Sequence, residues 1–267
     1  MKLFYRKFGD GPPLIILHGL YGSSDNWVSI AKKLADSFTV YLPDQRNHGQ
    51  SPHSEIHDYE SMRDDLFELV NDLHIRKFFL AGHSMGGKTA IAFAVKWPEL
   101  INGLVILDVS PFTNENNKCT VYNQHLTILN AILSIDLASI SSRGEAEKLL
   151  SEKISSEKDR GLILKNLQRN SGDKFSWKLN AVSLYNNLNN IMAAIALKED
   201  LLFPVTGFPA IFLKGSYSNY LTATDVTGIR EIFPAAEFVV INGAGHWIHA
   251  DKPDEVVCNL KKLLYEF

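Results

Sequence analysis

Short apolar runs alternate with amphipathic segments along the first two-fifths of the chain. The runs have the length of buried strands, and they cover residues 14–17, 38–42, 78–81 and 104–107. Between them, apolar residues recur every three or four positions, which predicts helices over residues 27–34, 59–73 and 88–96. Strands that alternate with helices predict right-handed crossovers and an α/β fold, with a mostly parallel central sheet flanked by helices.

The pattern changes after Pro111. Between residues 113 and 203 no clear buried-strand run occurs. The periodicity there predicts helices over residues 121–133, 145–154, 162–170 and 181–196, with one strand-like piece at 175–177. Strand and helix alternate again at residues 210–213, 225–232, 237–241 and 253–264. We therefore expect a core of residues 1–112 and 204–267, and a helical cap, residues 113–203, inserted after the strand that carries Asp108.

Composition and charge favour a soluble globular protein. Of the 267 residues, 45% are hydrophobic and 21% are charged, and the net charge of −3 gives no electrostatic reason to expect nucleic acid as a partner. No apolar run approaches the roughly 18 residues that a membrane span needs. Cys119 and Cys258 lie far apart and are expected to be free thiols. These features, with no apolar leader in view, predict a cytoplasmic protein that is a monomer or a homodimer.

A G-x-S-x-G motif, Gly82 to Gly86, lies between a predicted strand and a predicted helix. A tight turn from strand to helix is the setting of a nucleophile elbow. Because glycine has no Cβ atom, Gly82 and Gly86 allow the strand and the helix to approach closely, while Ser84 takes a strained conformation. We expect Ser84 to be a catalytic nucleophile; the alternative is an ordinary glycine-rich turn.

An activated serine needs a base, and a histidine on a late loop is the best candidate. His246 follows an apolar strand and two glycines, Gly243 and Gly245, which allow the loop to bring the imidazole toward Ser84. His249 is the rival candidate. The glycine-flanked position favours His246.

The acid of a serine–histidine–acid triad lies between the other two members in the sequence of G-x-S-x-G hydrolases. The loop after the strand at 210–213 is a usual place for it, but no carboxylate occurs there before Asp225. Asp108 ends an earlier strand, at the sheet edge where active sites of α/β proteins collect. We expect Asp108 to be the acid and keep Asp225 as the alternative. Ser218 could hydrogen-bond Asp108 or the histidine as a fourth member.

Acyl transfer also needs two N–H donors for the developing oxyanion. The backbone N–H of Met85, at the start of the helix after Ser84, is one candidate. The other is the N–H of Leu20, because Gly19 and Gly22 allow the loop after the first buried strand to turn sharply.

The loop at residues 43–51 contains Asp44, Arg46 and His48, which we interpret as structural residues that hold neighbouring backbone. A direct substrate contact by Arg46 or His48 is the alternative. No Walker loop, dinucleotide fingerprint or Cys/His metal cluster occurs, so we expect no cofactor and no metal ion.

Taken together, these motifs resemble the α/β-hydrolase superfamily, over residues 14–111 and 210–267. Three segments are similar to the small bacterial YbfF-type esterases: R-N-H-G at 46–49, G-H-S-M-G-G-K at 82–88 and G-H-W-I-H-A-D-K-P at 245–253. In that group the acid follows the strand after the elbow helix, and a serine occupies the later loop. The resemblance therefore implies Asp108 as acid and Ser218 as its neighbour.

These observations predict a serine hydrolase that cleaves esters or thioesters of small to medium acyl groups, with Ser84 as nucleophile, His246 as base and Asp108 as acid. Its expected partner is a small-molecule substrate. The same residues could hydrolyse C–C bonds or lactones, and a non-catalytic binding protein is an alternative of another class. A dehalogenase or epoxide hydrolase is disfavoured because such enzymes have an aspartate at the position of Ser84.

Overall fold

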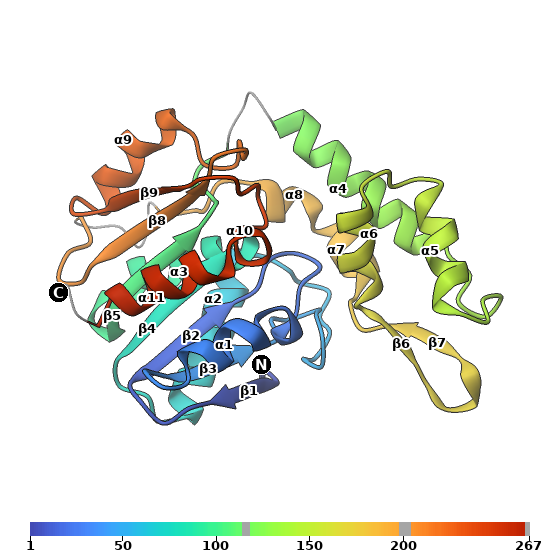
Figure 1. The fold of residues 1–267 in the computed structure, drawn as a ribbon, viewed down its shortest axis with the longest axis horizontal. Coiled ribbons are helices and arrows are strands. Elements are labelled where there is room, and N and C mark those ends of the chain that lie inside the picture. Colours follow the sequence, from blue (N-terminus) through green and yellow to red (C-terminus); the bar gives the residue numbers. More distant parts are fainter. Residues whose placement is uncertain (114–117, 198–203, 265–267) are drawn as a thin grey trace.

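A seven-stranded sheet forms the centre of the protein, with strand order β1-β3-β2-β4-β5-β8-β9 (Figure 1). The computed structural model describes residues 1–113, 118–197 and 204–264. β1 pairs antiparallel with β3, and the other neighbours in the sheet pair in parallel, which confirms the predicted fold. The strands are β1 (Tyr5–Phe8), β2 (Pro13–Leu17), β3 (Thr39–Pro43), β4 (Phe78–His83), β5 (Ile101–Leu107), β8 (Ala210–Gly215) and β9 (Glu237–Ile241).

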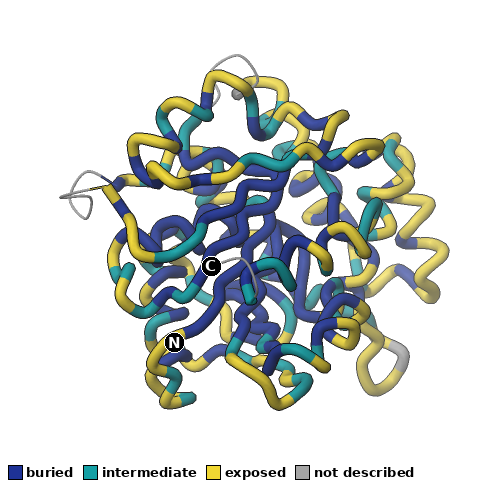
Figure 2. Tube along the Cα trace, turned by 60° about the vertical axis from the view of Figure 1, so that its left-hand side comes forward, coloured by how far each residue is buried: buried dark blue, intermediate teal, exposed yellow. Residues whose placement is uncertain are grey.

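Helices cover both faces of the sheet. Two helices pack on one face, α1 (Val28–Leu34) and α11 (Pro253–Lys262). Three pack on the other, α2 (Tyr59–Asp72), α3 (Met85–Lys96) and α9 (Ala223–Ile232). All residues of β4 are buried as a result, and Figure 2 shows the central strands as a buried interior. Burial on both faces explains why these strands are continuous apolar runs in the sequence.

The chain between β5 and β8 forms a separate group of short elements, set to one side of the sheet in Figure 1. It contains α4 (Lys118–Leu133), α5 (Arg143–Ser151), α6 (Glu157–Leu164), the hairpin β6 (Leu167–Arg169) and β7 (Phe175–Trp177), α7 (Ala181–Asn186) and α8 (Leu188–Met192). Their apolar side chains share one cluster with Leu20, Tyr21 and Met85 of the core. The elements therefore pack over the loops that follow β2 and β4. The division of the chain into a core and a cap, residues 113–203, remains a prediction.

Two helices expected in this region are wrong in detail. The helix expected at 162–170 ends at Leu164, and the following residues form β6, which pairs antiparallel with β7. Gly172, with φ of 74°, allows the turn between these strands. The helix expected at 181–196 is broken at Asn187, whose side-chain amide donates to the carbonyl of Glu55 at 2.7 Å.

The remaining elements are single turns. They are the 3₁₀ turns η1 (Ser24–Trp27), η2 (Pro98–Leu100) and η3 (Ser171–Asp173), and the short helix α10 (Ile248–Asp251).

Candidate active site

Ser84 lies in the turn between β4 and α3. Its φ of 52° and ψ of −119° fall in a region that residues other than glycine seldom occupy, so the expected strained conformation is present. The backbone N–H of Ser84 donates to Leu107 O at 3.1 Å, which fixes the turn to the end of β5. The side chain thus stands at the carboxyl edge of the sheet, at the N-terminus of α3.

The two motif glycines are required by this turn. A Cβ atom at Gly82 would lie 2.2 Å from Gly86 O, and one at Gly86 would lie 2.5 Å from His18 O. Any side chain at either position would collide with backbone, so the strand and helix could not approach as they do.

The structure brings His246 to Ser84. His246 lies on the loop that follows β9, and its Nε2 lies 3.0 Å from Ser84 Oγ. Two contacts hold the ring and its backbone: Tyr220 stacks on the imidazole with ring centroids 3.6 Å apart, and His83 Nε2–H donates to His246 O at 2.8 Å. His249, the alternative base, instead stacks on Trp27, with ring centroids 4.6 Å apart.

Asp108 lies on the other side of His246. Its Oδ2 is 2.8 Å from His246 Nδ1 and also accepts a hydrogen bond from Ser218 Oγ, while its Oδ1 accepts from Gly215 N at 3.0 Å. The backbone of Asp108 has a φ of 52°, directly after β5. The carboxylate is fully buried and all of its acceptor contacts hold it toward the histidine.

Asp225, the alternative acid, has its hydrogen-bond partners away from His246. It forms a capping box with Thr222 at the start of α9, and its Oδ1 accepts a hydrogen bond from Ser110 Oγ at 2.8 Å. The structure therefore brings Asp108, and not Asp225, to the histidine.

The two candidate oxyanion donors, Leu20 and Met85, line the same pocket as Ser84. Within the part of the chain that the structure describes, neither backbone N–H has a hydrogen-bond acceptor. The loop that carries Leu20 is held at the next residue, where Tyr21 N donates to His48 Nε2 at 3.3 Å and Asn166 Nδ2 donates to Tyr21 O at 2.8 Å.

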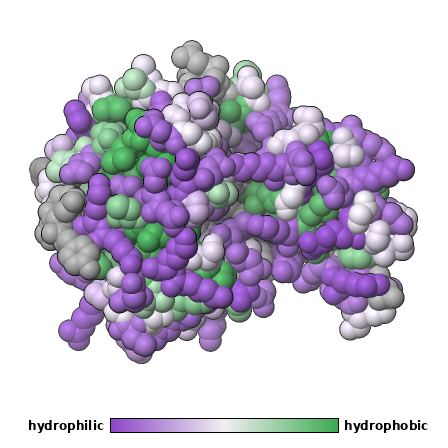
Figure 3. Space-filling model, in the orientation of Figure 1, coloured by the Kyte–Doolittle hydropathy of each residue, from purple (hydrophilic) through white to green (hydrophobic). Residues whose placement is uncertain are grey.

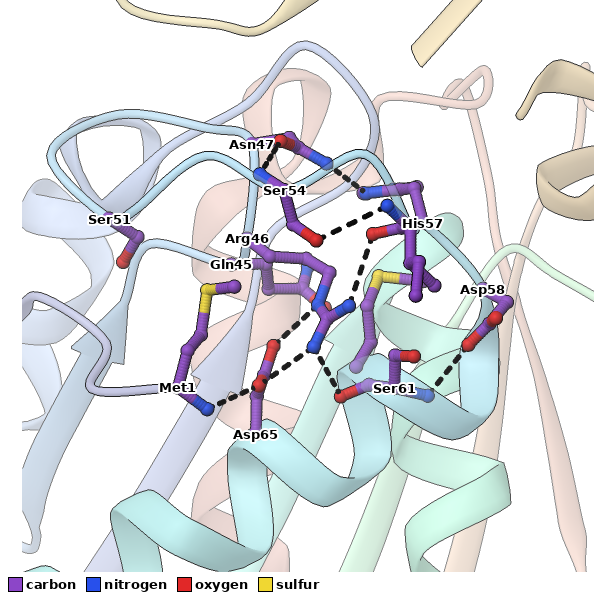
Figure 4. A network of polar contacts seen from close by, with 12 residues as sticks. Met1, Gln45, Arg46, Asn47, Ser51, Ser54, His57, Asp58, Ser61 and Asp65 are labelled. Atoms are coloured by element: carbon purple, nitrogen blue, oxygen red, sulfur yellow. Dashed lines mark hydrogen bonds and ion pairs between the residues drawn. The ribbon is translucent and has the colours of Figure 1, made fainter. Parts of the chain in front are cut away.

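The loop at 43–51 belongs to a network of polar contacts that includes residues of α2 (Figure 4). Buried Arg46 forms a bidentate ion pair with Asp65, at 2.6 and 2.9 Å, and also donates to the carbonyls of Ile56 and Ser61. His48 Nδ1–H donates to Arg46 O at 2.9 Å. Both side chains therefore hold protein groups, as the structural interpretation of this loop expects.

Six buried imidazoles near the site have lowered pKa values, which favours their uncharged form. Burial lowers the pKa of His57 and His249 to about 3, and that of His125 to about 4. Burial also lowers the pKa of His18, and that of His48 and His83 well below the usual range. These rings act as fixed hydrogen-bonding and packing groups.

Two pockets meet at Ser84. The first has about 690 Å³ of empty space and is walled mainly by apolar side chains, among them Val109, Phe112 and Ile191. The second has about 540 Å³ and is more polar, with Gln124 and Asp159 in its wall. Leu20, Ser84, His125 and Tyr220 belong to both. Figure 3 shows apolar atoms where the core meets the cap elements.

Three residues of these walls were missed in the sequence. Tyr220 lies in the loop with Ser218, and His125 lies on α4. No motif around either residue indicates that it lies near His246 in the fold. Lys88 had such a signal: it follows Ser84 by four positions and therefore lies on the same face of α3.

The described residues contain neither a candidate metal-ligand cluster nor a candidate membrane-spanning helix. No group of three or more His, Cys, Asp or Glu side chains among them could hold a metal ion. None of the described helices has the length and apolar character of a membrane span. The expected lack of a cofactor, the cytoplasmic location and the oligomeric state remain predictions.

Residues 12–253 match the alpha/beta hydrolase fold family. The chain belongs to this family. It is 37% identical to the sn-1-specific diacylglycerol lipase ABHD11 of Danio rerio, over 94% of this chain and 78% of the relative. Esterase YbfF of Escherichia coli (strain K12) is 29% identical, over 94% of this chain and 92% of the relative. A solved marine microorganism esterase is 43% identical with a TM-score of 0.93, over 98% of this chain and 99% of that one. These matches confirm the predicted superfamily and support a hydrolase that acts on esters.

Proposed function

We propose that this alpha/beta hydrolase cleaves carboxylic esters or thioesters of small to medium acyl groups through an acyl-enzyme on Ser84. The observation that carries the proposal is the continuous chain of contacts from Ser84 Oγ to His246 Nε2, at 3.0 Å, and from His246 Nδ1 to Asp108 Oδ2, at 2.8 Å. Relatives named esterase and lipase support the same chemistry.

In the first step, His246 Nε2 accepts the proton of Ser84 as Oγ attacks the substrate carbonyl carbon. Asp108 keeps Nδ1 protonated and stabilises the imidazolium that forms. The N–H groups of Leu20 and Met85 hold the oxyanion, and such donors are each worth about 3 kcal/mol of transition-state stabilisation.

The tetrahedral intermediate then breaks its bond to the leaving group. His246 donates its proton to the departing alcohol or thiol, which leaves an ester between the acyl group and Ser84. Water attacks this ester in the same way, with His246 as base, and releases the acid and free enzyme.

The two pockets suit the two parts of such a substrate. The apolar walls of the first pocket fit the acyl group, because burial of its methylene groups is favourable by about 0.8 kcal/mol each. The more polar second pocket, which also reaches His246, fits the leaving group that this residue protonates.

Labelling with a fluorophosphonate probe tests the proposal, because only an activated serine reacts readily with it. Intact-mass and peptide analysis should find one adduct, on Ser84. Hydrolysis of p-nitrophenyl esters and acyl-CoA thioesters, followed side by side, should show turnover of one or both. A protein that is not labelled and turns over neither class would contradict the proposal and favour a binding function.

A further inference from the structure

Lys88 is a cationic side chain inside the first, otherwise mainly apolar pocket. It lies one turn of α3 after Ser84, since Lys88 N donates to Ser84 O at 3.0 Å. Only 6% of its surface is exposed. The ammonium group of Lys88 takes no part in the proposed acyl transfer.

The protein partners of Lys88 leave part of the ammonium group unused. Nζ donates to Ala193 O at 2.6 Å and lies 5.5 Å from the centre of the Tyr59 ring. An ammonium carries three N–H donors, and one carbonyl uses only one of them. Among the residues that the structure describes, no carboxylate lies within ion-pair distance of Nζ.

Fastening of α8 to the core does not account for a charge at this position. A neutral group is sufficient to hold α8 against the core, because Tyr59 OH donates to Ile191 O at 2.6 Å. A buried charge without an opposite charge is costly, and it is retained where a binding partner supplies one. Burial lowers the pKa of Lys88 to about 8, with Asp225 opposing the shift, so most molecules still carry the charge at pH 7.

We propose that Lys88 determines substrate specificity by binding a carboxylate at the far end of the acyl group. The preferred substrates would then be monoesters or monothioesters of short dicarboxylic acids. This inference rests on the proposed function, because it needs the acyl carbonyl to lie at Ser84.

The geometry of α3 limits the length of such an acyl group. One helical turn rises about 5.4 Å, so Lys88 starts about one turn along α3 from Ser84, on the same face of the helix, and both residues line the same pocket. A chain of a few methylene groups, as in a succinyl or glutaryl group, spans this distance. Val109, Phe112 and Ile191 supply apolar walls for those methylenes.

A pair of methyl esters of equal length tests the inference. Monomethyl glutarate ends in a carboxylate, and methyl pentanoate ends in a methyl group; release of acid from each is followed in a pH-stat. Methyl esters are suitable because activated esters of these diacids hydrolyse by attack of their own carboxylate. The wild-type kcat/KM should favour monomethyl glutarate. Lys88→Met should lower that ratio by on the order of 30-fold or more, as expected when one partner of a buried charge pair is removed.

Two variants distinguish specificity from a structural role. Lys88→Arg keeps the charge and should retain most of the preference. Tyr59→Phe removes the other hydrogen bond to α8 without a change in charge, so it should leave the ratio unchanged even if both rates fall. Equal losses for both esters in Lys88→Met would overturn the inference.

Fluorophosphonate labelling of the same samples separates this inference from the proposed function. A wild-type enzyme that is labelled at Ser84 but shows no preference for the carboxylate ester would overturn the inference alone. A wild-type enzyme that is not labelled and hydrolyses neither ester would overturn the proposed function, and the inference with it.

Discussion

His246 Nδ1 lies 2.8 Å from Asp108 Oδ2, although 138 positions separate the two residues in the sequence. The strand order explains the contact. β4, β5, β8 and β9 are neighbours in the sheet, and the residues that follow their ends are Ser84, Asp108, Ser218 and His246, in that order. Asp108 thus reaches His246 from the end of β5, while Ser218, in the loop after β8, donates a hydrogen bond to Asp108.

Asp108→Asn should lower kcat by about four orders of magnitude, because an amide no longer fixes the proton on His246 Nδ1. Steady-state hydrolysis of a short p-nitrophenyl ester measures this. Asp225→Asn is the matched control: it weakens a helix cap, worth about 1 kcal/mol of stability, and should change kcat less than tenfold. The reverse order of effects would show that Asp225 is the acid.

Ser218 is expected to act as a positioning residue through Asp108. Ser218→Ala removes a hydrogen bond to a charged group, worth about 1.5–3 kcal/mol, and should lower kcat by about tenfold or more while KM changes little. Ser216→Ala, in the same loop, removes only a contact with Gly243 N and should leave kcat within about twofold of the wild type. Equal kinetics for the two variants would exclude this role.

The preference for carboxylate-ended esters should depend on pH. Lys88 is charged below its pKa of about 8, so the ratio of kcat/KM for monomethyl glutarate to methyl pentanoate should be high at pH 7 and fall above pH 8. Titration of an enzyme group that affects both substrates equally does not change this ratio.

The pKa values of the three other titratable side chains that line the pocket with Lys88, namely Tyr59, His125 and Tyr220, are shifted away from that range. Burial lowers the pKa of His125 to about 4 and raises those of Tyr59 and Tyr220 above the usual range for tyrosine. Asp225, on α9, acts on Lys88 from a distance and raises its pKa. A ratio that stays constant from pH 6 to about pH 10 would argue against Lys88 as the anchor.

The buried histidines should make the fold sensitive to acid. Their pKa values in the folded state are lowered, so below pH ~6.5 the unfolded chain binds protons that the folded chain does not. The free energy of unfolding should therefore fall as pH drops from 6.5, by up to about 1.4 kcal/mol per pH unit for each such histidine. The side chains concerned are His18, His48, His57, His83, His125 and His249.

Urea unfolding at pH 7.5, 6.5 and 5.5 measures this slope. His57→Gln removes one of these histidines. It should reduce the change of unfolding free energy with pH by up to the amount that one bound proton contributes. Constant or increasing stability on acidification would contradict the assignment of these rings as neutral in the folded protein.

Local pattern was sufficient to predict the sheet, its flanking helices and the elbow at Ser84. Buried parallel strands are continuous apolar runs, and the collision that a Cβ atom at Gly82 or Gly86 would cause is a consequence of the same short turn. The strand ends also indicated Asp108, because carboxyl edges of neighbouring strands meet at one edge of the sheet.

Features that depend on distant partners could not be predicted. The hairpin of β6 and β7 needs the pairing of two short strands, and neither has a strong pattern alone. The break between α7 and α8 involves Asn187 and a carbonyl of Glu55, more than a hundred positions away. Tyr220 and His125 join the site only through packing of the cap on the core.

Replacement of Ser84 shows whether this residue is the nucleophile. Ser84→Ala and a remote control, Ser176→Ala in β7, would be compared with the wild type in ester hydrolysis under single-turnover and steady-state conditions. We expect a loss of at least about a thousandfold in kcat for Ser84→Ala, with the fold intact, and unchanged kinetics for Ser176→Ala. Hydrolysis by Ser84→Ala at a rate near that of the wild type would contradict an acyl-enzyme on Ser84.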